Sequence, residues 1–154
     1  MSLETFNQGI SKRKKKWLVT GCAGFIGTNL VKKLLELNQE VVGLDNFSTG
    51  KASNIEFLQE VKKLYPESSF NFIEGDIVRS KDCQKAVEGV DYILHQAALG
   101  SVPRSIKDPI SSHESNVTGF INMIWAAKDA EVKRFVYASS SSVYGDNPTL
   151  PKVE

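Results

Sequence analysis

The chain has 154 residues, of which 41% are hydrophobic, enough to bury one core and to form at most one full domain. Its formal net charge of +1 gives no electrostatic case for a nucleic-acid partner or for a membrane surface. No apolar run approaches the roughly 18 residues of a bilayer-spanning helix, and no signal-peptide pattern opens the chain, so we expect a cytoplasmic protein. Cys22 and Cys83 show no metal-type spacing, and we expect reduced thiols and no metal site.

Residues 1–15 are predicted to be a flexible basic lead that precedes a single domain over residues 16–154. The run K-R-K-K-K at 12–16 is interpreted as a solvated approach to the first strand. An address signal or a nucleic-acid patch is the alternative interpretation of such a run.

A short apolar strand at 16–20 leads into three glycines spaced by three, Gly21, Gly24 and Gly27, and an amphipathic helix is predicted over 25–38. The first glycine permits a tight turn, the second lets the main chain approach a pyrophosphate, and the third allows close helix–sheet packing. The N–H groups at the start of the helix then form an anion site. Because the spacing differs from the usual G-x-G-x-x-G, the strand before and the helix after supply the needed context.

A second apolar strand at 40–44 ends at Asp45, which lies 18 residues past Gly27. A carboxylate in this place accepts hydrogen bonds from the hydroxyls of an adenosine ribose. It would repel a 2′-phosphate by about 1–4 kcal/mol at a separation of about 4 Å. Residues 46–50 contain no arginine that would offset this repulsion, so the sequence favours NAD over NADP.

Strands and helices alternate along the remainder of the chain. Helices are predicted at 52–64, 80–88 and roughly 109–130, strands at 70–74, 91–95 and 134–138, and a loop with Gly100 and Pro103 follows the fourth strand. Repeated β–α units with apolar strands indicate an α/β fold, a Rossmann-like doubly wound parallel sheet covered on both faces. Ligands of such sheets bind beyond the carboxyl ends of the strands, and those ends carry Gly75-Asp76-Ile77, Gln96-Ala97-Ala98 and the serines 139–142.

These motifs resemble the extended short-chain dehydrogenase/reductase family, in particular its NAD-dependent nucleotide-sugar epimerases. The resemblance rests on V-T-G-C-A-G-F-I-G (19–27), L-D-N-F-S-T-G (44–50), G-D-I (75–77), H-Q-A-A (95–98), N-V-T-G (116–119) and S-S-S-S-V-Y-G (139–145). Within the family, A-A-L-G-S-V-P-R-S (97–105), the serine run and L-P-K-V-E (150–154) are most similar to UDP-N-acetylglucosamine 4-epimerases of surface-polysaccharide synthesis.

The resemblance implies NAD as the cofactor and a UDP-sugar as the substrate. The implied cofactor contacts are Gly21, Gly24, Phe25, Ile26, Gly27, Asp45, Asn46, Ser48, Thr49, Gly50, Asp76, Ile77, Gln96, Ala97, Ala98 and Ser115. Ser140, four residues before Tyr144, corresponds to the family's active-site Ser/Thr and would bond the sugar's 4-oxygen. Ser101, Ser141 and Ser142 are candidate sugar contacts. For Asn116, a direct role and a purely structural role, fixing the helix through its side chain, both stay open.

The implied reaction is epimerisation at C4 of the hexose through a 4-keto intermediate, with hydride passing to NAD and back. The family's base is the tyrosine of Y-x-x-x-K, and no tyrosine of this chain has lysine four places later. By resemblance, that motif would begin shortly after Glu154, on a helix that the chain lacks. We therefore expect a cofactor-binding part that is inactive alone, with the substrate domain absent and a homodimer formed by the full-length protein.

Two other functions stay open. A nucleotide-sugar 4,6-dehydratase of this family would usually carry Thr-Asp-Glu where this chain has Ser140-Ser141-Ser142, so the missing carboxylates count against it. The other is a non-catalytic NAD-binding module. The sugar is also open, with UDP-glucose and a uronic acid derivative as alternatives.

Overall fold

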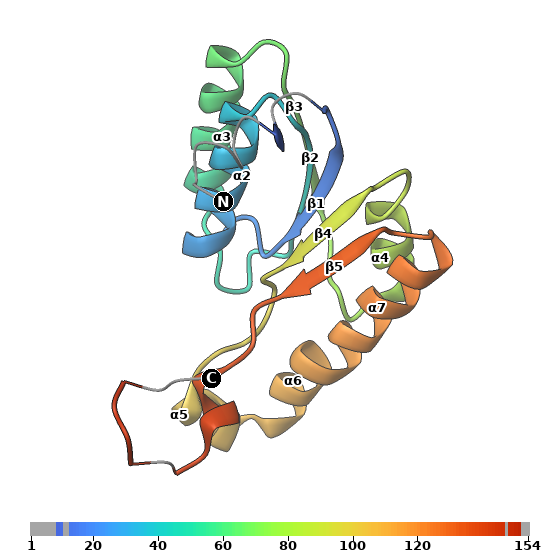
Figure 1. The fold of residues 1–154 in the computed structure, drawn as a ribbon. Helices are drawn as coiled ribbons and strands as arrows, with labels where there is room; N and C mark the ends of the chain where they lie inside the picture. Colours follow the sequence, from blue (N-terminus) through green and yellow to red (C-terminus); the bar gives the residue numbers. More distant parts are fainter. Residues whose placement is uncertain (1–8, 11–12, 147, 152–154) are drawn as a thin grey trace.

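Five parallel strands form one sheet in the order β3-β2-β1-β4-β5 (Figure 1). The structure, a computed structural model, describes residues 9–10, 13–146 and 148–151, so most of the predicted basic lead and residues 152–154 lie outside it. The strands are β1 (Lys16–Thr20), β2 (Glu40–Asp45), β3 (Ser69–Glu74), β4 (Tyr92–His95) and β5 (Arg134–Tyr137). Both β2 and β4 are neighbours of β1, so the strand order reverses there, and the predicted doubly wound α/β fold is confirmed.

Helices cover the two faces of the sheet separately. The helices α2 (Phe25–Glu36) and α3 (Ala52–Leu64) pack on one face, and α4 (Ser80–Ala86) and α7 (Gly119–Asp129) pack on the other (Figure 1). Successive side chains of a strand point to opposite faces, so Leu18 enters the core under α4 and α7 while Val19 enters the core under α2 and α3. Because both faces are covered there, the middle of β1, Trp17 to Val19, is an uninterrupted apolar run rather than an alternating one.

Two helices and one strand end one or two residues earlier than predicted. The helix predicted over 25–38 ends at Glu36, and Asn38 adopts a left-handed conformation (φ 56°) that ends helices. The helix predicted over 80–88 ends at Ala86, and the strand predicted over 134–138 ends at Tyr137. These differences leave the order of the elements unchanged.

The prediction of a loop with Gly100 and Pro103 is wrong in part, because residues Val102–Lys107 form the short helix α5. Ser101 caps this helix by accepting a hydrogen bond from the backbone N–H of Arg104, and Pro103 sits in the first turn. Proline lacks an N–H that the first turn would leave unpaired in any case, so it tolerates this position.

The long helix predicted over 109–130 is three consecutive segments. They are α6 (Pro109–His113), the π-helical turn η1 (Glu114–Thr118) and α7. Asp108 caps α6 by accepting from the N–H of Ser111. After β5, a 3-10 turn, η2 (Ser141–Tyr144), carries the serine run.

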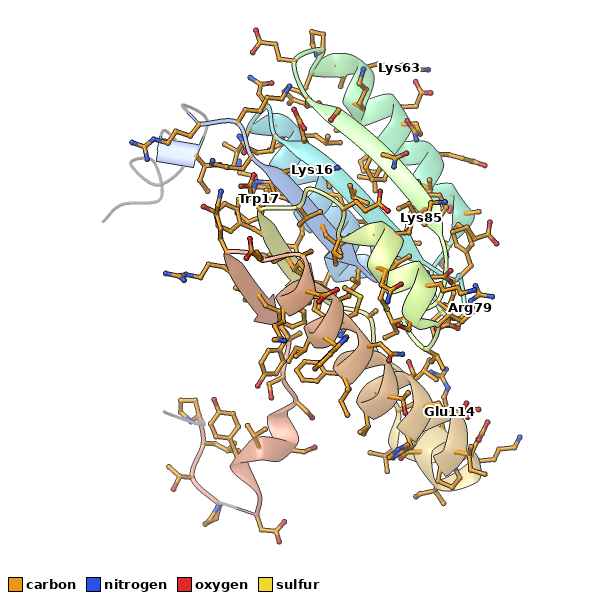
Figure 2. All side chains as sticks on the ribbon, turned by 90° about the vertical axis from the view of Figure 1, so that its right-hand side faces the viewer. Lys16, Trp17, Lys63, Arg79, Lys85 and Glu114 are labelled. Atoms are coloured by element: carbon orange, nitrogen blue, oxygen red, sulfur yellow. The ribbon has the colours of Figure 1, made fainter. Side chains whose placement is uncertain are left out.

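The two ends of the sheet differ in character. Figure 2 shows Lys16 and Trp17 near the end where the strands begin, away from Arg79 and Glu114. At the beginning of β1, the N–H of Lys16 donates to the Asp91 carboxylate. The polar loops that form the site lie at the opposite end, beyond the last residues of the strands.

None of the described helices is both long and apolar enough to cross a bilayer.

Candidate functional site

A pocket opens beyond the carboxyl ends of β1, β2, β3 and β4, where the strand order reverses. Twelve of the sixteen predicted cofactor-contact residues line it: Gly21, Gly24, Asp45, Asn46, Ser48, Thr49, Asp76, Ile77, Gln96, Ala97, Ala98 and Ser115. Leu44 and Gly75 complete the lining. Segments separated by up to 94 positions, from Gly21 to Ser115, therefore meet at one site.

In the glycine turn (residues 21–27), Gly21 and Gly27 lie where the backbone leaves no room for a side chain. Gly21 has a φ of +68°, and a Cβ there would lie 2.8 Å from the backbone nitrogen of Ala97. At Gly27 a Cβ would lie 2.1 Å from the carbonyl oxygen of Gly21. Gly27 is not among the residues that line the pocket, and its missing side chain lets α2 pack against the turn at Gly21 and Cys22, whereas the sequence predicted packing on the sheet.

The N-terminus of α2 reaches this pocket through Gly24, its N-cap residue. No side chain caps the helix and its first turn carries no acidic residue, so the helix itself supplies no acceptor for the N–H groups of its first turn. The side chains of Phe25 and Ile26 are 84% and 58% exposed and do not line the pocket. What these two residues offer an anion is their backbone N–H groups.

Asp45 holds the glycine turn and the loop after β2 together. Its carboxylate is only 8% exposed, and its Oδ2 accepts from the N–H of Ala23 (2.9 Å) while Oδ1 accepts from the N–H of Phe47 (2.8 Å). Gly50 is not among the residues that line the pocket; it packs against this carboxylate, where a Cβ would lie 2.9 Å from Oδ1. The sequence predicted a ribose contact for Asp45, and the structure adds this structural role.

The loops after β2 and β3 are joined at the mouth of the pocket. The amide of Asn46 donates to Oδ2 of Asp76 at 2.8 Å. Each of these side chains also accepts from the backbone N–H two residues ahead, that of Ser48 for Asn46 and that of Val78 for Asp76. Such local bonds order a loop without regular secondary structure.

The segment 96–99 is held at both ends by side chains from other elements. The hydroxyl oxygen of Thr20 accepts from the N–H groups of Gln96 and Ala97, each at 3.2 Å. The amide of Asn116, in the π-helical turn, accepts from the N–H of Leu99 (2.7 Å) and donates to its carbonyl (3.0 Å). Of the two roles left open for Asn116, the structure shows a structural one, and the partner is this loop.

The same segment also lines a second cavity of about 540 Å³, within the size range of small-molecule sites. Its lining includes the predicted sugar contacts Ser101 and Ser142 and the predicted catalytic residue Ser140. The Ser140 hydroxyl donates to the Ser142 hydroxyl (3.0 Å) and accepts from the Ser142 N–H (3.2 Å). Ser141 begins η2, and its side chain lies outside the described part of the structure.

His95 also lines this cavity, and sequence analysis did not select it as a site residue. The side chain is 5% exposed, its Nδ1 lies 2.8 Å from the Thr20 hydroxyl, and burial lowers the pKa of His95 to about 4. The sequence shows only that a histidine ends the predicted strand at 91–95. Its importance appears only from the register, which pairs Thr20 with His95.

The two cysteines are not candidates for nucleophilic chemistry. Cys22 and Cys83 are buried free thiols in different cores. Burial raises the pKa of both, that of Cys83 to about 12, so the reactive thiolate is disfavoured.

Comparison with known proteins gives a consistent picture. The sequence pattern of the NAD dependent epimerase/dehydratase family matches residues 17–154. A UDP-glucose 4-epimerase of Klebsiella pneumoniae is 36% identical over 90% of this chain and 99% of its own length. Four further curated relatives of that name, one of them putative, are 34–40% identical, and the chain covers only 40–42% of their lengths.

Solved structures agree with these relatives. A Stenotrophomonas maltophila UDP-glucose-4-epimerase with bound NAD superimposes with a TM-score of 0.80 at 31% identity, over 90% of this chain and 40% of its own. A UDP-N-acetylglucosamine 4-epimerase of Methanobrevibacter ruminantium gives 0.79 at 32% identity (92% and 43% covered). A dTDP-glucose 4,6-dehydratase of Streptomyces venezuelae with NAD bound gives 0.74 at 36% identity (84% and 41% covered).

Proposed function

Because this chain belongs to the NAD dependent epimerase/dehydratase family, whose structural neighbours bind NAD, we propose that it is the NAD-binding part of a UDP-hexose 4-epimerase. The observation that carries the proposal is the arrangement of two adjoining sites. The pocket at the glycine turn and the cavity at the serine turn share one wall, Gln96 to Ala98. A dinucleotide and a sugar bound in these two sites would meet at that wall.

The residues of the first pocket fit NAD. The uncapped helix N-terminus behind Gly24 suits a pyrophosphate, and no side chain obstructs the approach at Gly21. Asp45 ends β2 as an acidic residue, which favours an unphosphorylated ribose. We propose all sixteen predicted positions as the cofactor site, with Phe25, Ile26 and Gly27 acting through backbone N–H groups and Gly50 through its packing against Asp45. When bound, NAD supplies reversible hydride acceptance.

The second cavity would hold the hexose. In this proposal the Ser140 hydroxyl bonds the sugar's 4-oxygen as the proton moves, while Ser101, Ser141 and Ser142 contact the sugar. Positioning of this kind accounts for much of the rate in reactions of a bound substrate. No tyrosine in the chain has lysine four places later, so we expect no turnover by this chain alone.

We propose UDP-N-acetylglucosamine and UDP-N-acetylgalactosamine as the substrate pair, in cytoplasmic synthesis of surface-polysaccharide precursors. Support comes from the run 97–105, which supplies the shared wall and the capped helix α5, and from the Methanobrevibacter relative. UDP-glucose is the second candidate, because the curated relatives bear that name. A dehydratase is disfavoured, since the serine run offers no carboxylate at Ser140 to Ser142.

We further propose that the full-length protein is a homodimer. Along α7, Ile121, Ile124 and Trp125 are 58%, 43% and 59% exposed, which is a large apolar surface for a helix on the outside of a protein. This surface supports an interface between two copies of the long helix.

Calorimetric titration of the purified chain tests the proposal. We expect saturable binding of NAD, markedly weaker binding of NADP, binding of UDP-N-acetylglucosamine to the NAD-loaded chain, and no interconversion of the two sugars. The Asp45→Ala variant is expected to lose NAD binding. A folded chain that takes up no NAD, or a preference for NADP, would contradict the cofactor site, and turnover by the 154-residue chain would contradict the proposed inactivity.

A further inference from the structure

We propose that His95 is a sugar-binding residue, whose Nε2–H donates a hydrogen bond to a hydroxyl or keto oxygen of the hexose in the second cavity. This inference rests on the proposed function, because it takes the hexose to occupy that cavity. Three observations support it. The imidazole is held in one orientation, its hydrogen bond with the Thr20 hydroxyl sets the tautomer, and Nε2 is left without a partner in the described part of the protein.

The imidazole of His95 is held in one orientation. Its ring packs against the rings of Phe120 and Phe135, with centroids 5.6 and 5.5 Å away, and these two rings also contact each other, with centroids 5.9 Å apart. On the side of β1, Nδ1 lies 2.8 Å from the Thr20 hydroxyl, and both residues are at least nine-tenths buried. A ring fixed by two aromatic neighbours and one hydrogen bond does not change its direction freely.

The Thr20 hydroxyl decides which ring nitrogen carries the proton. Its oxygen accepts hydrogen bonds from the backbone N–H groups of Gln96 and Ala97, and a hydroxyl oxygen has two lone pairs. The Ala97 N–H has this hydroxyl as its acceptor, and the Gln96 N–H is shared between the hydroxyl and the Thr20 carbonyl oxygen, also at 3.2 Å. The lone-pair side of the hydroxyl therefore faces these two donors, and its hydrogen is left to donate to Nδ1 of His95. The neutral imidazole then carries its proton on Nε2.

The Nε2 atom has no partner within the described part of the protein, where the only hydrogen bond of the His95 side chain is made by Nδ1. No fully enclosed side-chain nitrogen or oxygen in that part lacks a partner, so Nε2 keeps some contact with solvent. Since His95 is 5% exposed and lines the second cavity, that contact is with the cavity. A polar atom this deeply placed is costly to leave unpaired when a ligand displaces the water.

The chemistry of the ligand follows from the charge state. The same burial lowers the pKa of His95 to about 4, so the ring is neutral at physiological pH and offers one N–H. A neutral single donor suits an uncharged acceptor oxygen, whereas phosphates are usually bound by cationic side chains or clusters of N–H groups. The serines that line the same cavity also offer hydroxyls suited to a sugar.

Two variants of Thr20 and one of His95 test the proposal on the NAD-loaded chain. His95→Phe keeps an aromatic ring against Phe120 and Phe135 and removes both nitrogens. Thr20→Val removes the hydroxyl that fixes the tautomer, and Thr20→Ser restores it as the matched control. Titrations use UDP-N-acetylglucosamine, UDP and NAD, since UDP lacks the hexose.

We expect His95→Phe to weaken UDP-N-acetylglucosamine binding about tenfold, as for the loss of one hydrogen bond, and to leave UDP and NAD within about twofold. In ¹⁵N spectra of the wild-type ring, Nδ1 should be unprotonated and the Nε2–H resonance should shift on addition of the UDP-sugar. Thr20→Val should mix the tautomers, and Thr20→Ser should restore the wild-type spectrum.

A proton on Nδ1, an unmoved Nε2–H resonance on saturation with the UDP-sugar, or equal losses for all three ligands in His95→Phe would overturn the assignment. The last outcome would mean that His95 only supports the fold. A wild-type chain that binds NAD but no UDP-sugar would overturn the proposed function, and the His95 assignment with it.

Discussion

Acidification is expected to destabilise the folded chain over a pH range that His95 sets. Its pKa is about 4 in the folded state and 6.5 in an unfolded chain. As the pH falls from 6.5 to 4, the unfolded state binds a proton that the folded state does not, so the free energy of unfolding falls. The difference of about 2.5 pKa units corresponds to a loss of about 3 kcal/mol at about 1.4 kcal/mol per unit.

Paired carboxylates act in a lower range. The pKa of Asp82 is lowered first by the N–H of Asp76, and that of Asp91 first by the Lys133 ammonium. A carboxylate with a lowered pKa stabilises the fold above its ordinary value, 3.8 here, and loses that contribution as the pH falls further. The range between pH 6.5 and 4 therefore reports mainly on the histidine.

Urea unfolding followed by circular dichroism at several pH values between 7 and 4.5 measures this effect. His95→Phe should flatten the dependence over that range, whereas His113→Gln removes the exposed histidine and is the matched control. The reasoning is wrong if His95→Phe and the wild type lose the same free energy of unfolding over this range.

Three substitutions test the packing and hydrogen bonds around the two sites. Gly27→Ala should cost at least about 3 kcal/mol of stability, because its Cβ meets fixed backbone 2.1 Å away, and thermal unfolding would show this against Gly100→Ala, which has open space. Asp45→Ala should cost about 2–4 kcal/mol in urea unfolding, since two backbone N–H groups lose a charged acceptor; an unchanged midpoint would contradict that role. Asn116→Ala should cost about 1–2 kcal/mol and speed hydrogen exchange at the Leu99 amide, and unaltered exchange would mean that the clamp does not hold the loop.

The fold was predictable because its signals are local. Each strand is an apolar run that ends in a polar or glycine-rich turn, and the glycines Gly21, Gly24 and Gly27 lie between an apolar strand pattern and an amphipathic helix pattern. The pocket followed from a general property of parallel sheets, since polar residues at the strand ends must meet. Asp45 was selected by its position at the end of β2, 18 residues past Gly27, and the structure places it in the lining of the pocket.

The features that the sequence did not predict are of two kinds. Some depend on contacts between distant segments, and others on local conformations of nearly equal energy. Pro103 is compatible with a loop and with the first turn of a helix, so α5 was missed. A π-helical turn adds one residue to a helix, which its apolar spacing does not disclose. The pairing of Thr20 with His95 joins residues 75 positions apart and needs the strand register.

The central place of β1 has a consequence for how the chain folds during synthesis. Lys16 pairs with Glu40 only 24 positions later, but Trp17 pairs with Tyr92 after 75. A nascent chain can therefore pair β1, β2 and β3 early, whereas the other edge of β1 stays unpaired until β4 has been synthesised. Distant pairings form slowly and leave strand edges exposed to aggregation, so we expect ribosome-bound intermediates of this protein to depend on chaperones until β4 has emerged.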